Sequence, residues 1–254
     1  MSDSSRCSRG WGVVATAATG LFFSTGTIVV LSFGVFVKPL SQSFHAGRAA
    51  ISLAFTLHGL LSAACVPLTG HLIDVFGARR VILTGTAIFG LILLSSPFVG
   101  SNLPSLYLFY AALGIVSGTT SPVPYGVVIS HWFDRQRGLA LGLMACGIGL
   151  GAIAMPLAAQ HLIVLFGWRA TYAVFGCTTL LLSLPVVAAF LAERPRRKGA
   201  GPDGILPLHS TSPENYEGLS WHNTWHQPTF WLLLCAFFWR VRACSRVFFT
   251  CLHC

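Results

Sequence analysis

The longest charge-free run of this chain covers 53 residues, from position 81 to position 133. Four further runs of at least 23 residues without Asp, Glu, Lys or Arg lie before and after it, and the first of them has 28 residues. A helix needs about 20 apolar residues to cross a bilayer, so the longest run is enough for two crossings. Turn-forming residues between Pro97 and Pro104 favour a division there. These runs predict a chain that crosses a membrane several times.

The composition supports the same conclusion. Hydrophobic residues make up 54% of the chain and charged residues only 9%, whereas soluble domains carry about 25% charged residues and disordered chains are poor in apolar ones. We therefore predict an all-α polytopic membrane protein with six transmembrane helices. The predicted helices cover residues 13–37, 50–71, 81–100, 105–130, 139–161 and 169–191.

The basic residues predict an orientation. A net charge of +9 could indicate nucleic-acid binding, but these residues stand singly or in pairs between apolar runs and form no basic face, so we expect no nucleic-acid partner. With the N-terminus in the cytoplasm, ten Lys or Arg fall in inner segments and three in outer ones, as the positive-inside rule favours. We expect a multi-pass protein of the plasma or inner membrane, surrounded by membrane lipids.

Composition changes divide the chain into four parts. We expect a cytoplasmic N-terminus over 1–12, a six-helix domain over 13–192 and a polar cytoplasmic linker over 193–228. Over 229–254 an apolar run begins and then changes into a segment with three cysteines among its last fifteen residues. The sequence therefore predicts a truncated seventh helix with an aberrant tail, and a frameshift or a misread gene end would explain it.

The loop between the second and third predicted helices reads GHLIDVFGARR over 70–80. An acid at a helix end can pair with arginines or with a helix dipole, and glycine allows a tight turn. The run resembles the G-x-L-x-D-R-x-G-R-R signature of the major facilitator superfamily, although Val75 stands at the family's first Arg. The resemblance implies a latch in an alternating-access cycle; anchoring of the topology is the alternative. The motif residues are Gly70, Asp74, Gly77, Arg79 and Arg80.

The loop before the fifth predicted helix reads HWFDRQRGLALGLMACG over 131–147. It resembles the signature of the branch that contains monocarboxylate porters and oxalate/formate antiporters. The run GWGVV over 10–14 is similar to the first-helix opening of that branch, with Arg9 in place of its usual acid. The resemblance implies two six-helix halves, each built from two inverted three-helix repeats, with the substrate site between the halves. The loop residues are Trp132, Phe133, Arg135, Arg137 and Gly142.

Two titratable residues are candidates for the substrate and proton pathway. Lys38 ends the first predicted helix, where it could supply the fixed cation that an anion carrier needs. In the resembled branch a lysine at the matching position takes part in substrate and proton binding, and snorkelling to the headgroups is the alternative. His58 lies in the middle of the second predicted helix and could carry a proton. A neutral, hydrogen-bonded interior histidine is the alternative.

The fourth predicted helix contains hydroxyl residues next to two prolines, Pro122 and Pro124. Prolines free backbone carbonyls, and such kinked segments line transporter sites. Thr119, Thr120 and Tyr125 are therefore candidates to line the pathway, with hydrogen bonds to their own helix as the alternative. Glycines of the fifth predicted helix are expected to allow close packing. They are Gly138, Gly142, Gly147, Gly149 and Gly151.

The sequence thus predicts a secondary transporter for a small organic anion such as a monocarboxylate, working by proton symport or anion exchange. A porter for a drug or a sugar is one alternative, and an inactive fragment is another. Self-association could supply the missing C-terminal half. The chain carries no Walker loop and no Ser/His/Asp set. We expect no enzymatic activity, no cofactor and no metal site.

Overall fold

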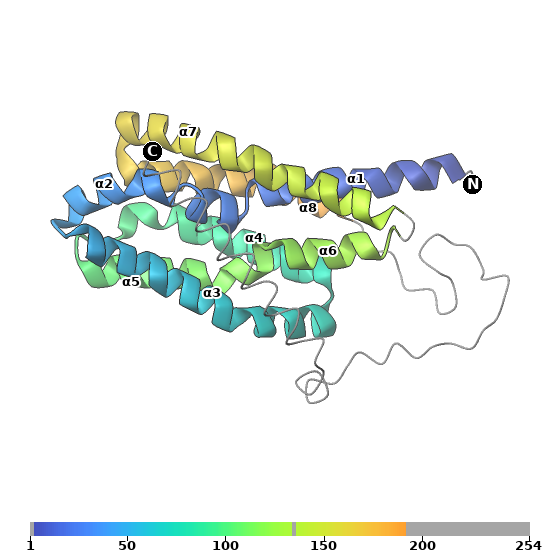
Figure 1. Cartoon of the computed structure of the whole chain (residues 1–254), viewed down its shortest axis with the longest axis horizontal. Coiled ribbons are helices and arrows are strands. Elements are labelled where there is room, and N and C mark those ends of the chain that lie inside the picture. Colours follow the sequence, from blue (N-terminus) through green and yellow to red (C-terminus); the bar gives the residue numbers. More distant parts are fainter. Residues whose placement is uncertain (1–2, 134–135, 192–254) are drawn as a thin grey trace, which may run out of the picture. The chain divides into compact units, whose positions relative to one another are not determined.

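The computed structural model describes residues 3–133 and 136–191. Within these ranges every regular element is a helix. The helices lie roughly lengthwise beside one another, with α2 toward one end and α6 toward the other (Figure 1). The predicted linker over 193–228, the segment over 229–254 and Arg135 lie outside the described residues.

The elements follow the chain in one order. They are α1 (Asp3–Phe22), η1 (Gly26–Val30), α2 (Phe33–Phe44), α3 (Arg48–Phe76), α4 (Ala78–Leu94), η2 (Ser96–Phe98), α5 (Leu103–Ser117), η3 (Gly118–Thr120), α6 (Pro122–Ser130), α7 (Arg137–Thr178), η4 (Thr179–Ser183) and α8 (Leu184–Phe190). The elements η1 and η4 are π-helical, and η2 and η3 are 3₁₀-helical.

Four helical stretches in the described part are long and apolar enough to cross a membrane. They are Gly10–Val30, Arg48–Phe76, Leu103–Ser130 and Arg137–Phe190. The helix α4, which corresponds to the predicted span 81–100, has 17 residues. The stretch of 54 residues covers the predicted fifth and sixth spans, and its helix is interrupted at Gly167, where φ is 79° and ψ is 170°. The described part of the chain is therefore all-helical, and its long apolar helices indicate an integral membrane protein.

The first predicted span is not one continuous helix. We expected a helix over 13–37, but α1 ends at Phe22, and η1 and α2 follow after separate breaks. The hydroxyl of Thr27 donates to the backbone carbonyls of Phe22 (2.7 Å) and Ser24 (2.9 Å). Ser and Thr side chains that bond nearby carbonyls compete with the helical ladder. This competition explains why the helix is interrupted without a proline.

The fourth predicted span, 105–130, is broken as its prolines indicated. The helix α5 passes into η3, Ser121 is extended with φ −76° and ψ 168°, and α6 begins at Pro122. The two breaks meet inside the bundle, because the Thr25 and Thr120 hydroxyls lie 2.8 Å apart and share a hydrogen bond. The two interrupted spans are thus joined where each leaves regular helical geometry.

Two glycines of α7 allow that helix to lie against the first span. A Cβ at Gly147 would lie 2.7 Å from the carbonyl carbon of Ala18, and a Cβ at Gly151 would lie 2.6 Å from Cγ2 of Thr27. By contrast, Gly138, Gly142 and Gly149 have no such neighbours. Close packing therefore explains Gly147 and Gly151, but it does not explain the other three glycines of the run.

Two apolar clusters fill the bundle. The first contains Phe36, Phe89, Tyr110, Trp168 and Tyr172 among its members, and the second forms around α1, α4 and α6. In the first cluster, Phe36 stacks on Tyr172 at a ring-centroid distance of 4.2 Å. The Tyr110 and Tyr172 hydroxyls share a hydrogen bond of 3.0 Å, so neither is buried without a partner.

Candidate functional site

One side of α2 faces away from the bundle core. Phe36, Leu40 and Phe44 are fully or almost fully buried, while Gly34, Lys38 and Gln42 are exposed. Residues four apart lie on one face of a helix, so the three exposed residues form a single strip, which we name the Lys38 strip. Lys38 lies six residues before the end of α2, about 9 Å along the helix axis.

The exposed part of α3 has two chemically different faces. One face carries large apolar side chains, and Leu60 is 67% exposed. These residues are Leu53, Leu57, Leu60, Leu68 and Val75. The other face repeats with the same spacing and consists mainly of small or polar residues, all of them exposed except the half-buried Gly70, with the exposed Val66 at its edge. These are Ser52, Thr56, Gly59, Ala63, Pro67, Gly70 and Asp74.

The first part of α7 shows the same division. Its leucine face contains Leu139, Leu143, Leu150, Ile153 and Leu157, all strongly exposed. Its small-residue face is exposed at five positions and half-buried at Ala152 and Pro156. The members of this face are Gly138, Gly142, Ala145, Gly149, Ala152, Pro156 and Gln160. Leucine suits lipid contact, whereas small residues let another helix approach closely.

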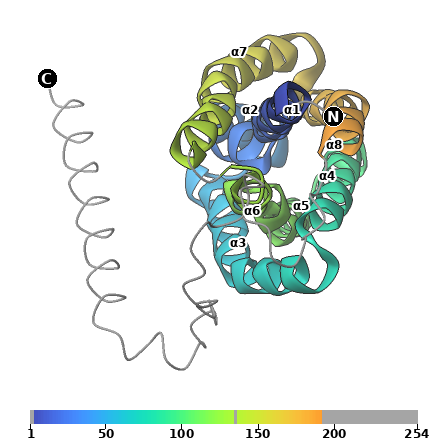
Figure 2. The same cartoon turned by 90° about the vertical axis from the view of Figure 1, so that its right-hand side faces the viewer.

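The two small-residue faces border α2. The ring of Phe55, next to the small-residue face of α3, stacks on Phe33 of α2 at a centroid distance of 4.2 Å. On α7, Ala159 belongs to the buried cluster that contains Phe36 and Leu40 of α2, and Gln160 follows it. The end-on view shows α2 between α3 and α7 (Figure 2). The Lys38 strip therefore runs between two faces of small and polar residues.

The structure buries His58, whereas Lys38 is exposed. The His58 side chain is 2% exposed, on the side of α3 that packs against α5, and its ring lies 6.0 Å from that of Phe55. Its Nδ1 has no hydrogen-bond partner among the described residues. The backbone of Gly114 in α5 approaches the His58 backbone so closely that an added Cβ would lie 2.6 Å from the His58 carbonyl oxygen.

The three hydroxyl candidates of the fourth span lie within the bundle. Thr120 is buried and bonds Thr25, while Thr119 donates to the carbonyl of Val116 at 2.7 Å. Tyr125 is fully buried, and it packs so closely on Gly20 that a Cβ there would lie 2.7 Å from its Cζ.

The loop between α3 and α4 is built on a glycine conformation. Gly77 caps both helices with φ 84° and ψ 148°, a region that residues with a Cβ rarely adopt. The guanidinium of Arg79 donates to the carbonyl of Ala188 in α8 at 2.8 Å. The motif thus links this loop to the end of the last described helix, while Asp74 and Arg80 are exposed.

The loop before α7 is fixed to α1 by aromatic residues. The ring of Phe133, 8% exposed, lies 5.2 Å from that of Trp11, and a Cβ at Gly10 would lie 2.9 Å from Phe133 Cζ. Trp132 is half-buried and Arg137 begins α7. Gly142 faces open space. This aromatic contact is a feature that the sequence analysis missed.

Comparisons with known proteins show which family the chain resembles. The family model of the Major Facilitator Superfamily matches residues 13–250. The chain belongs to this superfamily. It is 29% identical over 217 residues to the oxalate:formate antiporter of Oxalobacter formigenes, covering 83% of the chain and 47% of that protein. It is 30% identical over 191 residues to monocarboxylate transporter 13 of Bos taurus, covering 73% and 42%.

The similarity extends to a further transporter. The riboflavin transporter RibJ of Trypanosoma cruzi is 32% identical over 156 residues, which cover 60% of the chain and 32% of that protein. The chain spans about half or less of the length of these three relatives. The resemblance inferred from the two loop motifs is confirmed at the level of the superfamily, and its monocarboxylate and oxalate/formate members are among the relatives.

Proposed function

We propose that this chain forms one half of a secondary transporter for small organic anions, with Lys38 as the cation that binds the substrate. The observation that carries the proposal is the position of Lys38. It is exposed on a strip between two faces of small and polar residues, within a membrane-embedded bundle. Relatives named as oxalate:formate and monocarboxylate transporters support an anionic substrate.

A charge within a membrane-spanning helix has an energetic cost, which favours a functional role for such a residue. A Lys at the centre of a membrane helix costs about 2.5–3.5 kcal/mol on insertion scales. Lys38 lies about 9 Å inside the end of α2, so its long side chain could also reach the headgroups. An anionic substrate would compensate the charge in place of water or lipid phosphate. Transport measurements distinguish these two uses of the lysine.

We propose six crossings with the N-terminus in the cytoplasm, and a second six-helix bundle packed on the small-residue faces of α3 and α7. Small residues at both faces suit close helix contact, and the leucine faces suit lipid. The second bundle is a continuation of the chain or a second copy of it. A reporter fused after Lys198 should then be cytoplasmic, and a signal from the opposite side of the membrane would contradict this topology.

The transport experiment uses the full chain reconstituted in liposomes, with labelled oxalate, formate or lactate and with an imposed proton or counter-anion gradient. We expect gradient-dependent uptake that is lost in Lys38→Gln and largely retained in Lys38→Arg. The matched control is Arg48→Gln, which removes an exposed cation at the start of α3, outside the strip.

The outcomes of this experiment distinguish the proposed function from its alternatives. Equal uptake by Lys38→Gln and by the unmodified chain would contradict substrate binding by Lys38. The alternative, in which its side chain snorkels to the lipid headgroups, would then be supported. Uptake of a neutral drug or sugar in place of anions would favour the alternative substrate classes. No uptake of any of these compounds by correctly inserted protein would support an inactive half.

A further inference from the structure

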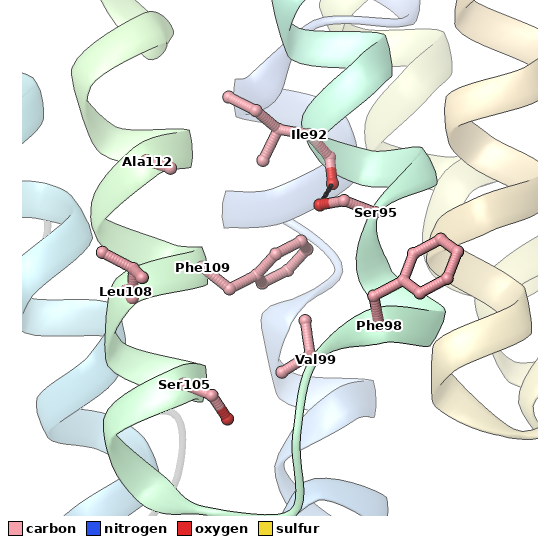
Figure 3. A pocket seen from close by; sticks show the side chains of 8 residues that line it. All are labelled: Ile92, Ser95, Phe98, Val99, Ser105, Leu108, Phe109 and Ala112. Carbon is pink, nitrogen blue, oxygen red and sulfur yellow. Dashed lines mark hydrogen bonds between the residues drawn. The ribbon is translucent and has the colours of Figure 1, made fainter.

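A groove lies between α4 and α5 at the end of the bundle where the two helices are joined. It has a volume of about 330 Å³, at the low end of the range for ligand pockets. Apolar side chains line most of it, and Figure 3 shows them on both sides of the space. They are Ile92, Phe98, Val99, Leu108, Phe109 and Ala112.

The groove faces the surroundings of the bundle. Phe98 is 89% exposed and Leu108 is 73% exposed, while Phe109 is 5% exposed and belongs to the core. The α5 wall extends from Ser105 to Ala112, a rise of about 10 Å along the helix axis. One leaflet of the hydrocarbon core is about 15 Å deep. The α5 wall of the groove is therefore about two thirds as long as one leaflet is deep.

The polar groups in the groove have partners in the protein. The Ser95 hydroxyl donates to the carbonyl of Ile92 at 2.7 Å, as Figure 3 shows. The Ser105 hydroxyl bonds the carbonyls of Gly100 (2.9 Å) and Asn102 (2.6 Å). An occupant of the groove thus needs no hydrogen-bonding groups, which favours a hydrocarbon chain over a polar solute.

A positively charged side chain is hydrogen-bonded to one wall residue of the groove. The guanidinium of Arg169 donates through Nε (3.3 Å) and Nη2 (3.1 Å) to the carbonyl of Val99, which lines the groove. The same guanidinium lies 4.6 Å from the ring centroid of Trp168. Arg169 is half-buried and follows the break at Gly167, so it lies at the start of a helical segment, where basic residues commonly meet the membrane interface.

We infer that this groove binds one acyl chain of an anionic phospholipid, with the lipid phosphate beside Arg169. The apolar walls give the site its affinity for hydrocarbon, and the guanidinium selects a negatively charged headgroup. The site is separate from the Lys38 strip, because it is formed by α4, η2 and α5. Lipid binding here does not depend on the proposed transport activity.

The test uses the full chain in phosphatidylcholine vesicles that contain a minor fraction of phosphatidylglycerol with a photoactivatable acyl chain. Cross-linked residues are mapped by mass spectrometry. We expect labelling concentrated on Ile92, Leu108 and Ala112, and loss of this labelling in Ala112→Phe, which fills the groove. Leu108→Trp, a change at an exposed position, is the second groove variant. Ala64→Phe, on the exposed side of α3 outside the groove, should leave it unchanged.

A second arm tests the headgroup. Gln can still donate to the Val99 carbonyl, so Arg169→Gln removes the charge and keeps a donor for that loop. We expect it to reduce the preference for photoactivatable phosphatidylglycerol over phosphatidylcholine about fivefold, and Arg169→Lys to retain the preference.

Three results would overturn the inference. The first is equal labelling of the groove and of the leucine face of α3, which indicates ordinary surrounding lipid. The second is unchanged groove labelling in both Ala112→Phe and Leu108→Trp. The third is displacement of the label by a sterol but not by unlabelled phosphatidylglycerol, which would assign the groove to a different ligand.

Discussion

Replacing Gly147 by Ala tests the packing of α7 on α1 directly. The added Cβ would lie 2.7 Å from the carbonyl carbon and 2.8 Å from the Cα of Ala18, and real Cβ atoms essentially never approach other atoms closer than 3.0 Å. Both neighbours are backbone atoms, so no side chain can rotate away. The two helices would have to separate, at the usual overpacking cost of about 1–3 kcal/mol.

The matched control is Gly149→Ala, two residues along the same helix. No atom lies within 4 Å of its added Cβ. Alanine stabilises a helix relative to glycine by about 1 kcal/mol, and this gain is common to both variants. Their difference in the free energy of unfolding therefore reports the packing contact alone, about 1–3 kcal/mol. For a protein of this size this corresponds to a difference of about 2–12 °C in Tm.

The assay is thermal unfolding of the full chain in dilute detergent, followed by tryptophan fluorescence or by loss of the monodisperse peak in size-exclusion chromatography. We expect Gly147→Ala to unfold at the lower temperature of the two. Equal melting temperatures, or a higher one for Gly147→Ala, would refute the close approach of α7 and α1 at Ala18.

Four further predictions use the same preparations. Gly77→Ala should lower the free energy of unfolding by about 1–3 kcal/mol in the thermal assay, because φ is 84° and ψ 148° at this position, whereas Gly34→Ala, with open space around it, should not. Thr120→Val should lower the free energy of unfolding by about 0.6 kcal/mol in that assay, because it removes the hydrogen bond to Thr25. An unchanged free energy of unfolding would mean that this hydrogen bond contributes nothing to stability. Phe133→Ala should lower the free energy of unfolding by about 3–5 kcal/mol if its contacts with Trp11 and Gly10 are as tight as a core contact. Phe98→Ala should change it little, because Phe98 is 89% exposed. Gly59→Trp, on the small-residue face of α3, should abolish uptake in liposomes, and Leu60→Trp, on its leucine face, should not; equal uptake by both would contradict a second bundle on the small-residue face.

Charge placement predicted an all-helical chain with stretches long and apolar enough to cross a membrane, because a bilayer tolerates few charges within a span. It could not predict where helices break. The fourth span breaks at Pro122, as we expected, yet Pro39, Pro67 and Pro156 lie inside continuous helices. The break in the first span has no proline at all. Its only sequence signal is the run of Ser, Thr and Gly over 24–27, whose effect depends on which carbonyls the hydroxyl groups reach in the folded chain.

Only part of the candidate site could be predicted from the sequence. Lys38 could be selected by its type and position, but its setting depends on the neighbours of α2. The division of α3 and α7 into leucine and small-residue faces is present in the sequence at helical spacing, and it could have identified Ser52, Thr56 and Gln160. Which of these faces borders α2 follows only from contacts such as that of Phe33 with Phe55.

The broken helices also bear on which group would bind a substrate. In transporters, breaks commonly expose backbone carbonyls that bind ions or substrates. Here Thr27 bonds the carbonyl of Phe22 at 2.7 Å, and Thr120 donates to that of Ser117 at 3.2 Å. These hydroxyls occupy backbone acceptors at both breaks from within the bundle, and both threonines are buried.

In the proposed transporter, the breaks act on the shape and stability of the two spans, and Lys38 on the exposed strip is the group that binds an anion. Substitutions at the two positions should separate accordingly. A change at Thr120 should appear in the free energy of unfolding, and Lys38→Gln should appear in transport with little effect on unfolding, because Lys38 is exposed. If Thr120→Val altered substrate preference while Lys38→Gln did not, the substrate site would lie at the breaks rather than on the Lys38 strip.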